Sequence, residues 1–412
     1  MTPFPYQQLG IDFLKSHPKA FLFDDPGLGK TAQGLLAIDV SRPPLVICPK
    51  AAKSVWETEA AKFRPDLKPV TITGRKNFKW PTPGELVIVN PDIFPSVILG
   101  CPSGLQVLVD ECHMFKSPKS DRSKRLQSLS HYVSGSCGSV WGFTGTPVLT
   151  SPLDLWGLLY SLDLIPETYK TWINFKRLFR GFDVQFSKFV KVTKFPSTPL
   201  PGAMEPLAPY VLRRKREQVL PELPTKRYET YKVETNYKSQ IQISEEDINP
   251  FHTGREHIAT WRREVSEAKA KACLDYIKQL AEDQQLVIFT CFRRTARLLA
   301  EGDGVLLIDG ESSSAHRQEA ARSFQSGLCR VLVGTIGAMG VAVTLTASHR
   351  VIFIDRDWTP AMNKQAEDRV CRIGQTRGVI VTDVICNDPV DQIVTKVLVK
   401  KTQLIENTIE VL

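Results

Sequence analysis

One stretch near the start of the chain constrains its fold more than any other: residues 23–31 read FDDPGLGKT. The apolar run 20–23 leads into it, and the helical segment TAQGLLAIDV follows from residue 31. A short strand, a glycine-rich turn and a helix, in that order, are the setting that a phosphate-binding loop requires. The sequence therefore predicts a phosphate site at the start of an α/β domain.

Each residue of this loop has a predicted role. Gly27 and Gly29 allow the tight turn that directs backbone N–H groups at a ligand. Lys30 would reach the outer phosphates of a nucleotide, and the Thr31 hydroxyl would ligate magnesium. Asp24 departs from the strict pattern G-x-x-x-x-G-K-[ST], which has glycine at that position.

Further apolar runs alternate with helical segments after the loop, at residues 45–48, 86–89, 106–110 and 140–144. Runs of this kind predict a parallel sheet covered by helices on both faces. Ligands of such sheets bind at the carboxyl ends of the strands. Polar residues stand there in this chain: Asp110 and Glu111 end one run, and Thr144, Gly145 and Thr146 end another.

The pair Asp110-Glu111 predicts a division of labour beside the phosphate loop. Asp110 would hold magnesium, and Glu111 would orient and deprotonate an attacking water. Cys112 and His113 follow, but they lack partner ligands at metal-binding spacing, so we do not expect a metal site there. Near the start of the chain, the amide of Gln7 can donate to and accept from one base edge, which suits adenine recognition.

The second half repeats the alternation, with apolar runs at 286–290, 305–309, 330–334, 350–355 and 379–385, and predicts a second parallel sheet. The interval between the two sets is too long for a plain connection. It contains a basic, aromatic-rich stretch in which Trp172, Phe175, Phe179 and Phe182 recur at helical spacing, which predicts a helical insertion. We expect domains at 1–208 and 226–412, joined by a basic linker at 209–225.

Composition adds modest constraints. The net charge of +9, from 53 basic and 44 acidic residues, favours an anionic partner such as nucleic acid. We expect no secretory signal and no membrane span. Nine scattered cysteines without a C-x-x-C pair argue against disulfides and structural zinc and favour a reducing, intracellular setting.

Four stretches together resemble motifs I, Ia, II and III of superfamily 2 helicases: FDDPGLGKT, CPKAAKSVWETE, VLVDECHMFKSPKS and GFTGTPVLTSPLDLW. They are most similar to the Swi/Snf-type DNA translocases, in which aspartate is common at the position of Asp24. The TGTP sequence argues against RNA helicases of the DEAD-box type. QAEDRVCRIGQ at 365–375 resembles motif VI, and TIGAMGVAVTLTAS at 335–348 resembles motif V.

This resemblance implies two RecA-like domains with ATP and magnesium in a cleft between them. We expect Arg369 and Arg372 on one face of a helix, where they would stabilise charge on the transferred phosphoryl group. Gly340 would line the nucleotide site, along with Gln7, Asp24 and the loop residues. The resemblance assigns DNA contacts to Lys50, Trp56, Thr73, Gly74, Arg293, Arg294, Ser312, Thr335 and Trp358, and coupling to Thr144, Gly145, Thr146 and Gln365.

The implied activity is ATP-dependent translocation on duplex, forked or branched DNA, by a monomer. Contacts of this kind fall mainly on phosphates, so binding should be salt-sensitive and largely independent of base sequence. The chain most resembles the HARP-like annealing helicases and their prokaryotic and viral relatives. A small motor of this kind suits a prokaryotic or viral genome, so we expect it inside the cell, in the cytoplasm of a prokaryote or of a virus-infected host rather than in a nucleus.

Three alternatives stay open at this stage. A strand-separating helicase would need a wedge, which a short hairpin in the insertion could supply. A chromatin remodeller would need histone-reading modules, for which we see no room. A DNA clamp without enzymatic activity would tolerate damage to the ATP site, whereas Lys30, Glu111 and Arg372 are all intact.

Overall fold

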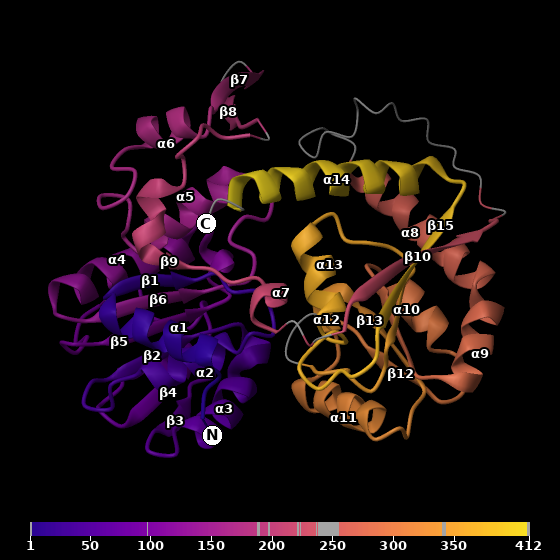
Figure 1. The fold of residues 1–412 in the computed structure, drawn as a ribbon, viewed down its shortest axis with the longest axis horizontal. Coiled ribbons are helices and arrows are strands. Elements are labelled where there is room, and N and C mark those ends of the chain that lie inside the picture. Colours follow the sequence, from indigo (N-terminus) through magenta and orange to yellow (C-terminus); the bar gives the residue numbers. More distant parts are fainter. Residues whose placement is uncertain are drawn as a thin grey trace. The chain divides into compact units, whose positions relative to one another are not determined.

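The computed structural model describes residues 2–96, 98–187, 190–196, 198–220, 222, 224–235, 237, 255–339 and 343–409. The chain divides into two compact units (Figure 1). The first comprises Met1–Leu220 together with Lys401–Leu412, and the second comprises Pro221–Lys400. Helix α14 (Pro389–Ile409) is shared, because its residues from Lys401 onward belong to the first unit. The predicted boundaries at 208 and 226 stay a prediction.

The first unit is built on a seven-stranded sheet with the order β3-β4-β2-β5-β6-β1-β9, in which every neighbouring pair is parallel. All five predicted strands are present, which confirms the predicted α/β class for this half. The strands are β1 (Lys19–Leu22), β2 (Pro44–Ile47), β3 (Lys68–Thr71), β4 (Glu85–Val89), β5 (Gln106–Asp110), β6 (Ser139–Phe143) and β9 (Val211–Leu212).

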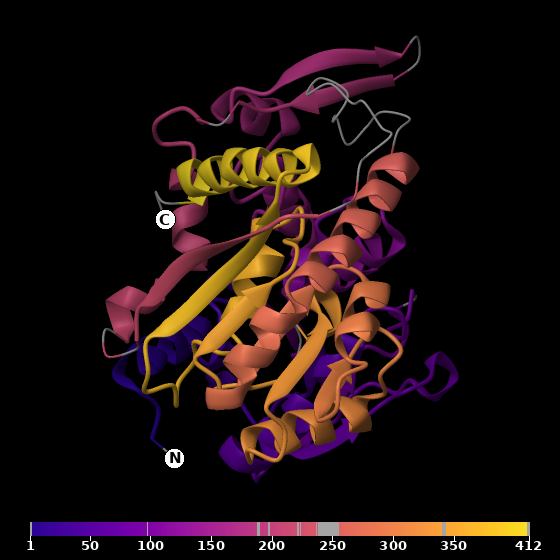
Figure 2. The same cartoon turned by 90° about the vertical axis from the view of Figure 1, so that its right-hand side faces the viewer.

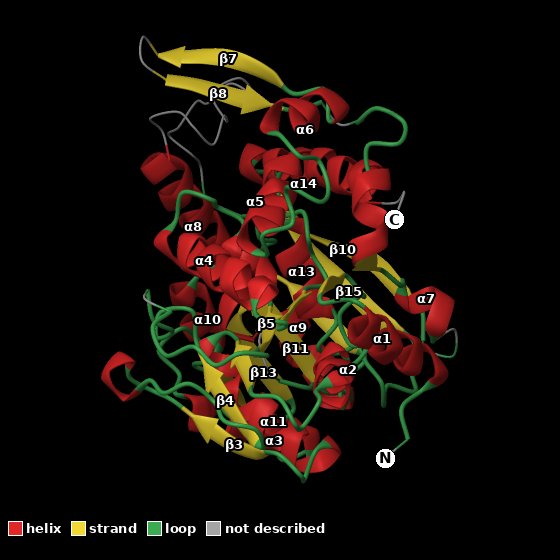
Figure 3. Cartoon of the chain, turned by 90° about the vertical axis from the view of Figure 1, so that its left-hand side faces the viewer, coloured by secondary structure: helices red, strands yellow, loops and turns green. Residues whose placement is uncertain are grey.

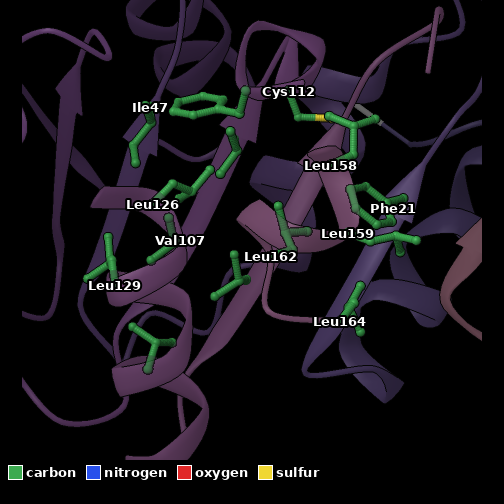
Figure 4. Packing of buried hydrophobic residues seen from close by; sticks show 14 of the residues in the cluster. Phe21, Ile47, Val107, Cys112, Leu126, Leu129, Leu158, Leu159, Leu162 and Leu164 are labelled. Atoms are coloured by element: carbon green, nitrogen blue, oxygen red, sulfur yellow. The ribbon is translucent and has the colours of Figure 1, made fainter. Parts of the chain in front are cut away.

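Alternate residues of these strands enter two separate cores. Phe21 and Phe23 join one cluster, while Ala20 and Leu22 join the other, as expected for a sheet buried on both faces. Figure 4 shows part of the first cluster, where Phe21 and Val107 meet leucines from α4 (Asp121–Gly135) and α5 (Pro152–Ser161). The second cluster lies under α1 (Pro5–Ser16), α2 (Lys30–Ala37) and α3 (Lys53–Phe63), of which α1 and α2 lie side by side in Figure 3.

The aromatic-rich insertion is only partly helical. Helix α6 (Trp172–Leu178) buries Phe175, and Phe179 is buried just beyond it, but Phe182 opens an antiparallel hairpin of β7 (Phe182–Ser187) and β8 (Val190–Lys194). The predicted helix stops because Arg180 has a left-handed backbone (φ 56°), and the glycine after it allows close packing. A β-carbon on Gly181 would lie 2.7 Å from Phe195 Cε1.

The second unit has a six-stranded parallel sheet in the order β10-β15-β14-β11-β13-β12. Its predicted strands are all present, and β10, which pairs with β15 over eight residues, is an addition. Figure 2 shows these strands, with β10 in rose and the others from orange to yellow, and the long helix α8 (Arg255–Ala272) across one face. The strands are β10 (Lys226–Val233), β11 (Leu286–Thr290), β12 (Val305–Ile308), β13 (Val331–Thr335), β14 (Arg350–Phe353) and β15 (Val379–Cys386).

Helices cover both faces of this second sheet as well. One core takes Trp261 and Val265 of α8, and the other takes Phe324 of α11 (Ser314–Gln325) and Ala366 of α13 (Pro360–Glu367). Among the described helices, none is both long and apolar enough to cross a membrane. The helices of this unit are α8 (Arg255–Ala272), α9 (Leu274–Asp283), α10 (Arg293–Leu299), α11 (Ser314–Gln325), α12 (Ile336–Met339) and α13 (Pro360–Glu367).

Close packing of α5 on η3 (Cys112–Phe115) supports the residues that follow β5. A β-carbon on Gly157 of α5 would lie only 1.8 Å from the carbonyl oxygen of Lys116. We expect Gly157→Ala to lower the free energy of unfolding by roughly 1–3 kcal/mol or more, because backbone must move to admit the methyl group. Thermal or denaturant-induced unfolding would measure this change.

Gly135 at the end of α4 provides the matched control, since a β-carbon there would meet nothing within 4 Å. Gly135→Ala should leave stability unchanged or raise it by up to about 1 kcal/mol, through the better helix propensity of alanine. Equal stability of the two variants would contradict the close approach of α5 to η3.

Candidate functional site

The predicted phosphate loop connects β1 to the first turn of α2. Gly27 and Gly29 both have positive φ, 89° and 73°, and Gly29 caps the N-terminus of α2. A β-carbon on Gly29 would also lie 2.4 Å from Gln7 Nε2. The loop therefore requires glycine for both conformation and space, and it presents the positive end of a helix dipole.

Lys30 and Thr31 begin α2 and are both half-buried. The Lys30 ammonium donates to the carbonyl oxygens of Asp24 (2.7 Å) and Asp25 (3.2 Å), so it lies over the main chain of the loop. Gln7 lies beside the loop, where its Nε2 donates to the Leu28 carbonyl (3.4 Å). These positions suit a nucleotide whose phosphates meet Lys30, while adenine recognition by Gln7 stays a prediction.

Asp24 is placed differently from our expectation of a cofactor-binding residue. Its side chain is 0% exposed, and its carboxylate accepts hydrogen bonds from Arg214 and Gln33. Only the Asp24 carbonyl faces Lys30. The carboxylate therefore binds buried side chains and does not face the nucleotide site. Arg214 is a functional candidate that sequence reasoning missed, although the basic run LRRKRE at 212–217 contained the signal.

Asp110 is the last residue of β5, and Glu111 follows it, close to the loop. Burial raises the pKa of Asp110 to about 6, aided by the neighbouring Glu111 charge and opposed by the Trp56 hydrogen bond and by Lys30. Burial disfavours the ionised carboxylate because it lacks a full countercharge, and a bound hard cation would supply that charge. Together with the Thr31 hydroxyl, the Asp110 carboxylate offers the oxygen donors that magnesium prefers, so these residues fit the expected ion.

Trp56, which we expected among the DNA contacts, is buried at 0% exposure. Its indole N–H donates to Asp110 Oδ2 at 2.9 Å. In this structure the side chain therefore orients the carboxylate and is not available at a surface. Helix α3 brings it there, and the sequence shows no periodic signal that would have identified the pair.

His113 links Glu111 to the end of the neighbouring strand β6. Its Nδ1 lies 3.1 Å from Glu111 Oε2 and 3.0 Å from Thr144 Oγ1. Glu111 has a left-handed backbone (φ 46°), an unusual conformation for a non-glycine residue and one that often marks a functional position. Sequence reasoning considered His113 only as a metal ligand, so it missed this linking role.

The turn after β6 also touches the phosphate loop. Thr144 is buried, and its hydroxyl accepts from the Thr146 N–H (3.1 Å). A β-carbon on Gly145 would lie 2.7 Å from Pro26 Cδ. Three predicted strand-end features, the loop, the acidic pair and the TGT turn, are therefore brought together within the first unit.

The predicted DNA contacts divide into exposed and buried residues. Lys50, Thr73, Arg293 and Arg294 are exposed, and both arginines make ion pairs with acidic neighbours. Among the other predicted contacts, Gly74, Ser312 and Trp358 are half-buried and Thr335 is buried. Gly340 lies outside the described residues.

The arginines predicted on one helix face lie beyond that helix. Helix α13 ends at Glu367, and residues 368–370 form turns, so Arg369 and Arg372 follow it in irregular backbone. The N–H groups of Val370 and Cys371 both donate to the Glu367 carbonyl, which closes the helix end. Arg372 donates to Thr344 Oγ1 (3.2 Å), and Gln365, predicted to couple the two sites, is buried in α13.

A charge network fixes the end of α13. Lys226 Nζ lies 2.9 Å from Glu367 Oε2 and 2.8 Å from Asp368 Oδ1, and Arg356 lies 2.5 Å from the other Glu367 oxygen. Burial acts to raise the pKa of Glu367, but Lys226 and Arg356 outweigh it and hold that pKa below its usual value. The network therefore anchors the turn that carries Arg369 and Arg372.

In comparison with known proteins, two family models match the chain. Residues 6–286 match the SNF2-related domain, and residues 268–374 match the helicase conserved C-terminal domain. A solved structure described as the Sulfolobus solfataricus SWI2/SNF2 ATPase core in complex with dsDNA is 21% identical, with a TM-score of 0.47, over 100% of this chain and 93% of that one.

Several curated relatives match almost the whole chain. The mouse DNA annealing helicase and endonuclease ZRANB3 is 27% identical over 98% of this chain and 40% of its own length. The SWI/SNF-related matrix-associated actin-dependent regulator of chromatin subfamily A-like protein 1 of Xenopus tropicalis is 26% identical over 97% of this chain and 44% of its own length. The chain thus spans less than half the length of these relatives.

Lys226 offers a test of the network at the end of α13. We expect Lys226→Met to lower the stability of the second unit at pH 7 by about 3–5 kcal/mol, because it leaves two buried carboxylates short of a countercharge. The pKa of Glu367 is lowered in the folded protein, so this contribution is complete above about pH 4.3 and is lost as the pH falls through the lowered value. Unfolding followed from pH 7 to pH 3 would measure it.

Lys278→Met, at an exposed position of α9, provides the control and should change stability by less than about 0.5 kcal/mol. A Lys226 variant that is as stable as this control, or a deficit that grows as the carboxylates become protonated, would refute the network.

Proposed function

Because this chain belongs to the SNF2-related domain family, we propose that it is an ATPase that uses hydrolysis to translocate on DNA. One observation carries the proposal: the phosphate loop, the Asp110-Glu111 pair and the TGT turn meet within one unit through His113 and Gly145. ATP-dependent helicases and DNA annealing helicases are named among the relatives, which supports the same activity.

The loop would hold the nucleotide in a defined way. The Lys30 ammonium would exchange its contacts with the Asp24 and Asp25 carbonyls for the outer phosphates, and the start of α2 would add backbone N–H donors. Thr31 and Asp110 would hold magnesium, which when bound neutralises charge on the phosphates. Trp56 keeps the Asp110 carboxylate oriented for this task.

Hydrolysis would depend on Glu111. Its carboxylate would orient and deprotonate the attacking water, and His113, which contacts both Glu111 and Thr144, would pass the state of this site to the turn after β6. From the second unit, Arg369 and Arg372 would stabilise charge on the transferred phosphoryl group. Both arginines lie in irregular backbone after the end of α13, and their side chains are half-buried.

DNA would be contacted mainly through its phosphates. Lys50 and Thr73 in the first unit, and Arg293 and Arg294 in the second, are exposed and available for such contacts. We propose duplex, forked or branched DNA as the substrate and a monomer as the active form. The intracellular setting also stays a prediction.

The hairpin β7-β8 favours a second candidate function, strand separation by a helicase. It stands in the insertion of the first unit, and Phe182 at its start is 50% exposed. An exposed aromatic residue on a hairpin can stack on a base at a strand junction. Unwinding of a forked duplex by the wild type, reduced at least tenfold in Phe182→Ala, would favour this alternative.

ATP hydrolysis measured without DNA and with single-stranded, duplex or forked DNA tests the main proposal. We expect duplex and forked DNA to stimulate the rate and added salt to reduce the stimulation. Glu111→Gln should lower kcat by about 10²–10⁴-fold, because it removes the general base while leaving ATP binding intact. Stimulation by single strands alone would point to the helicase, and absence of hydrolysis with every DNA would refute the motor.

A further inference from the structure

Beneath the phosphate loop lies a buried ion pair between residues 190 positions apart, Asp24 and Arg214. Arg214 Nε donates to Asp24 Oδ1 at 2.9 Å, and a second guanidinium nitrogen reaches the other carboxylate oxygen. Both side chains are buried. Because an unpaired charge in this position would be strongly destabilising, each residue requires the other.

The same guanidinium gathers the elements around the loop. It donates to the Tyr6 carbonyl of α1 and, at 2.7 Å, to Gln33 Oε1 of α2. Gln33 in turn donates to the Leu28 carbonyl inside the loop at 3.1 Å. A β-carbon on Gly10 would lie 1.9 Å from Gln33 Oε1, so α1 approaches this group as closely as glycine permits.

The segment around Arg214 is hydrogen-bonded along the phosphate loop. We call the hydrogen bonds between residues 212–216 and residues 23–26 the ladder. The Phe23 N–H donates to Leu212 O (2.9 Å), and the Asp25 N–H donates to Arg214 O (3.1 Å). Arg216 completes the ladder, because its N–H donates to Asp25 Oδ2 (3.2 Å) and its guanidinium to Pro26 O (2.6 Å). The parallel pairing of β1 with β9 therefore continues past both strands into the phosphate loop itself.

Two further facts give this ladder a functional meaning. Asp24 and Asp25, which hold Arg214 and Arg216, are also the residues whose carbonyls accept from Lys30. A phosphate that competes for the Lys30 ammonium would weaken its hydrogen bonds to these two carbonyls and so change the contacts of residues 24 and 25. The ladder residues also lead directly to Leu220, where the chain leaves the first unit.

We propose that Arg214 and Arg216 are positioning residues that couple ATP binding at the phosphate loop to residues 211–220, the segment through which the chain leaves the first unit. Arg214 contacts the loop through its buried hydrogen bonds to Asp24 and Gln33. Arg216 contacts it through hydrogen bonds to Asp25 and Pro26. This proposal rests on the proposed ATPase function and adds to it a path by which nucleotide occupancy is transmitted along the chain.

The basic run 213–216 provides its own probe, since trypsin cleaves after each of its four residues. In the wild type, ATP at 100 times its Kd should slow cleavage within this run by up to about 100-fold, because cleavage requires the ladder to open. Mass spectrometry of the fragments would give the rate at each bond, and the KM for ATP and kcat would be measured in parallel.

Three variants separate positioning from simple stability. Arg214→Lys keeps the charge but loses the forked geometry of the guanidinium. Arg216→Gln removes the guanidinium that donates to the Pro26 carbonyl and leaves the Asp24–Arg214 pair unchanged. The double variant Asp24→Leu/Arg214→Met replaces the pair by apolar groups, which proteins often tolerate without loss of stability. We expect each to raise the KM for ATP about tenfold or more and to reduce the protection by ATP.

Glu217→Gln, at an exposed position of the same segment, is the matched control and should keep both the KM and the protection of the wild type. If the double variant does not fold, Arg216→Gln carries the test. Variants that keep the wild-type KM and protection, or a wild type that binds ATP without slowing cleavage at 213–216, would overturn the coupling while leaving the ATPase proposal standing. A wild type that neither binds nor hydrolyses ATP would overturn both.

Discussion

A single buried carboxylate, Asp24, determines much of how the first unit is assembled. A charge with no exposure to solvent must be paired, and the partner here, Arg214, lies 190 residues further along the chain. The chain reaches Arg214 after it has traversed the whole insertion and returned to add β9 beside β1. Asp24, which departs from the strict phosphate-loop pattern, is thus paired with an arginine that follows closely after the two-residue edge strand β9.

The order β5-β6-β1 places three functional strand ends next to one another. Parallel strands carry their carboxyl ends to one edge of the sheet, so residues that are far apart in sequence reach one site without any special connection. Fine adjustment then comes from side chains: His113 joins Glu111 to Thr144, and Trp56 orients Asp110. The left-handed backbone of Glu111 is held by this packing, as strained functional residues commonly are.

The central strands and the residues at their ends could be predicted because continuous apolar runs and short motifs are local signals. The short or polar edge strands β3 and β9 carry no such signal, and β10 has no continuous apolar run, since all of its residues but the last are exposed or half-buried. The pairs Asp24–Arg214 and Trp56–Asp110 depend on tertiary contacts that no spacing reveals. The helix expected to carry Arg369 and Arg372 was wrong because backbone turns and the charge network around Glu367 end α13 earlier than side-chain spacing implies.

The segment between the two units begins and ends on functional residues. Arg216 is bound to Asp25 and Pro26 of the phosphate loop, and Lys226 is bound to Glu367 and Asp368, next to the arginines proposed to act on the transferred phosphoryl group. Each contact lies within its own unit, so each would persist in any arrangement of the two. The ten residue steps from Arg216 to Lys226 can span at most about 33–36 Å when fully extended, so the connection limits how far these two anchors can separate. A motor of this family would thus have a covalent path between its two sets of catalytic groups, in addition to any contacts that ATP or DNA creates.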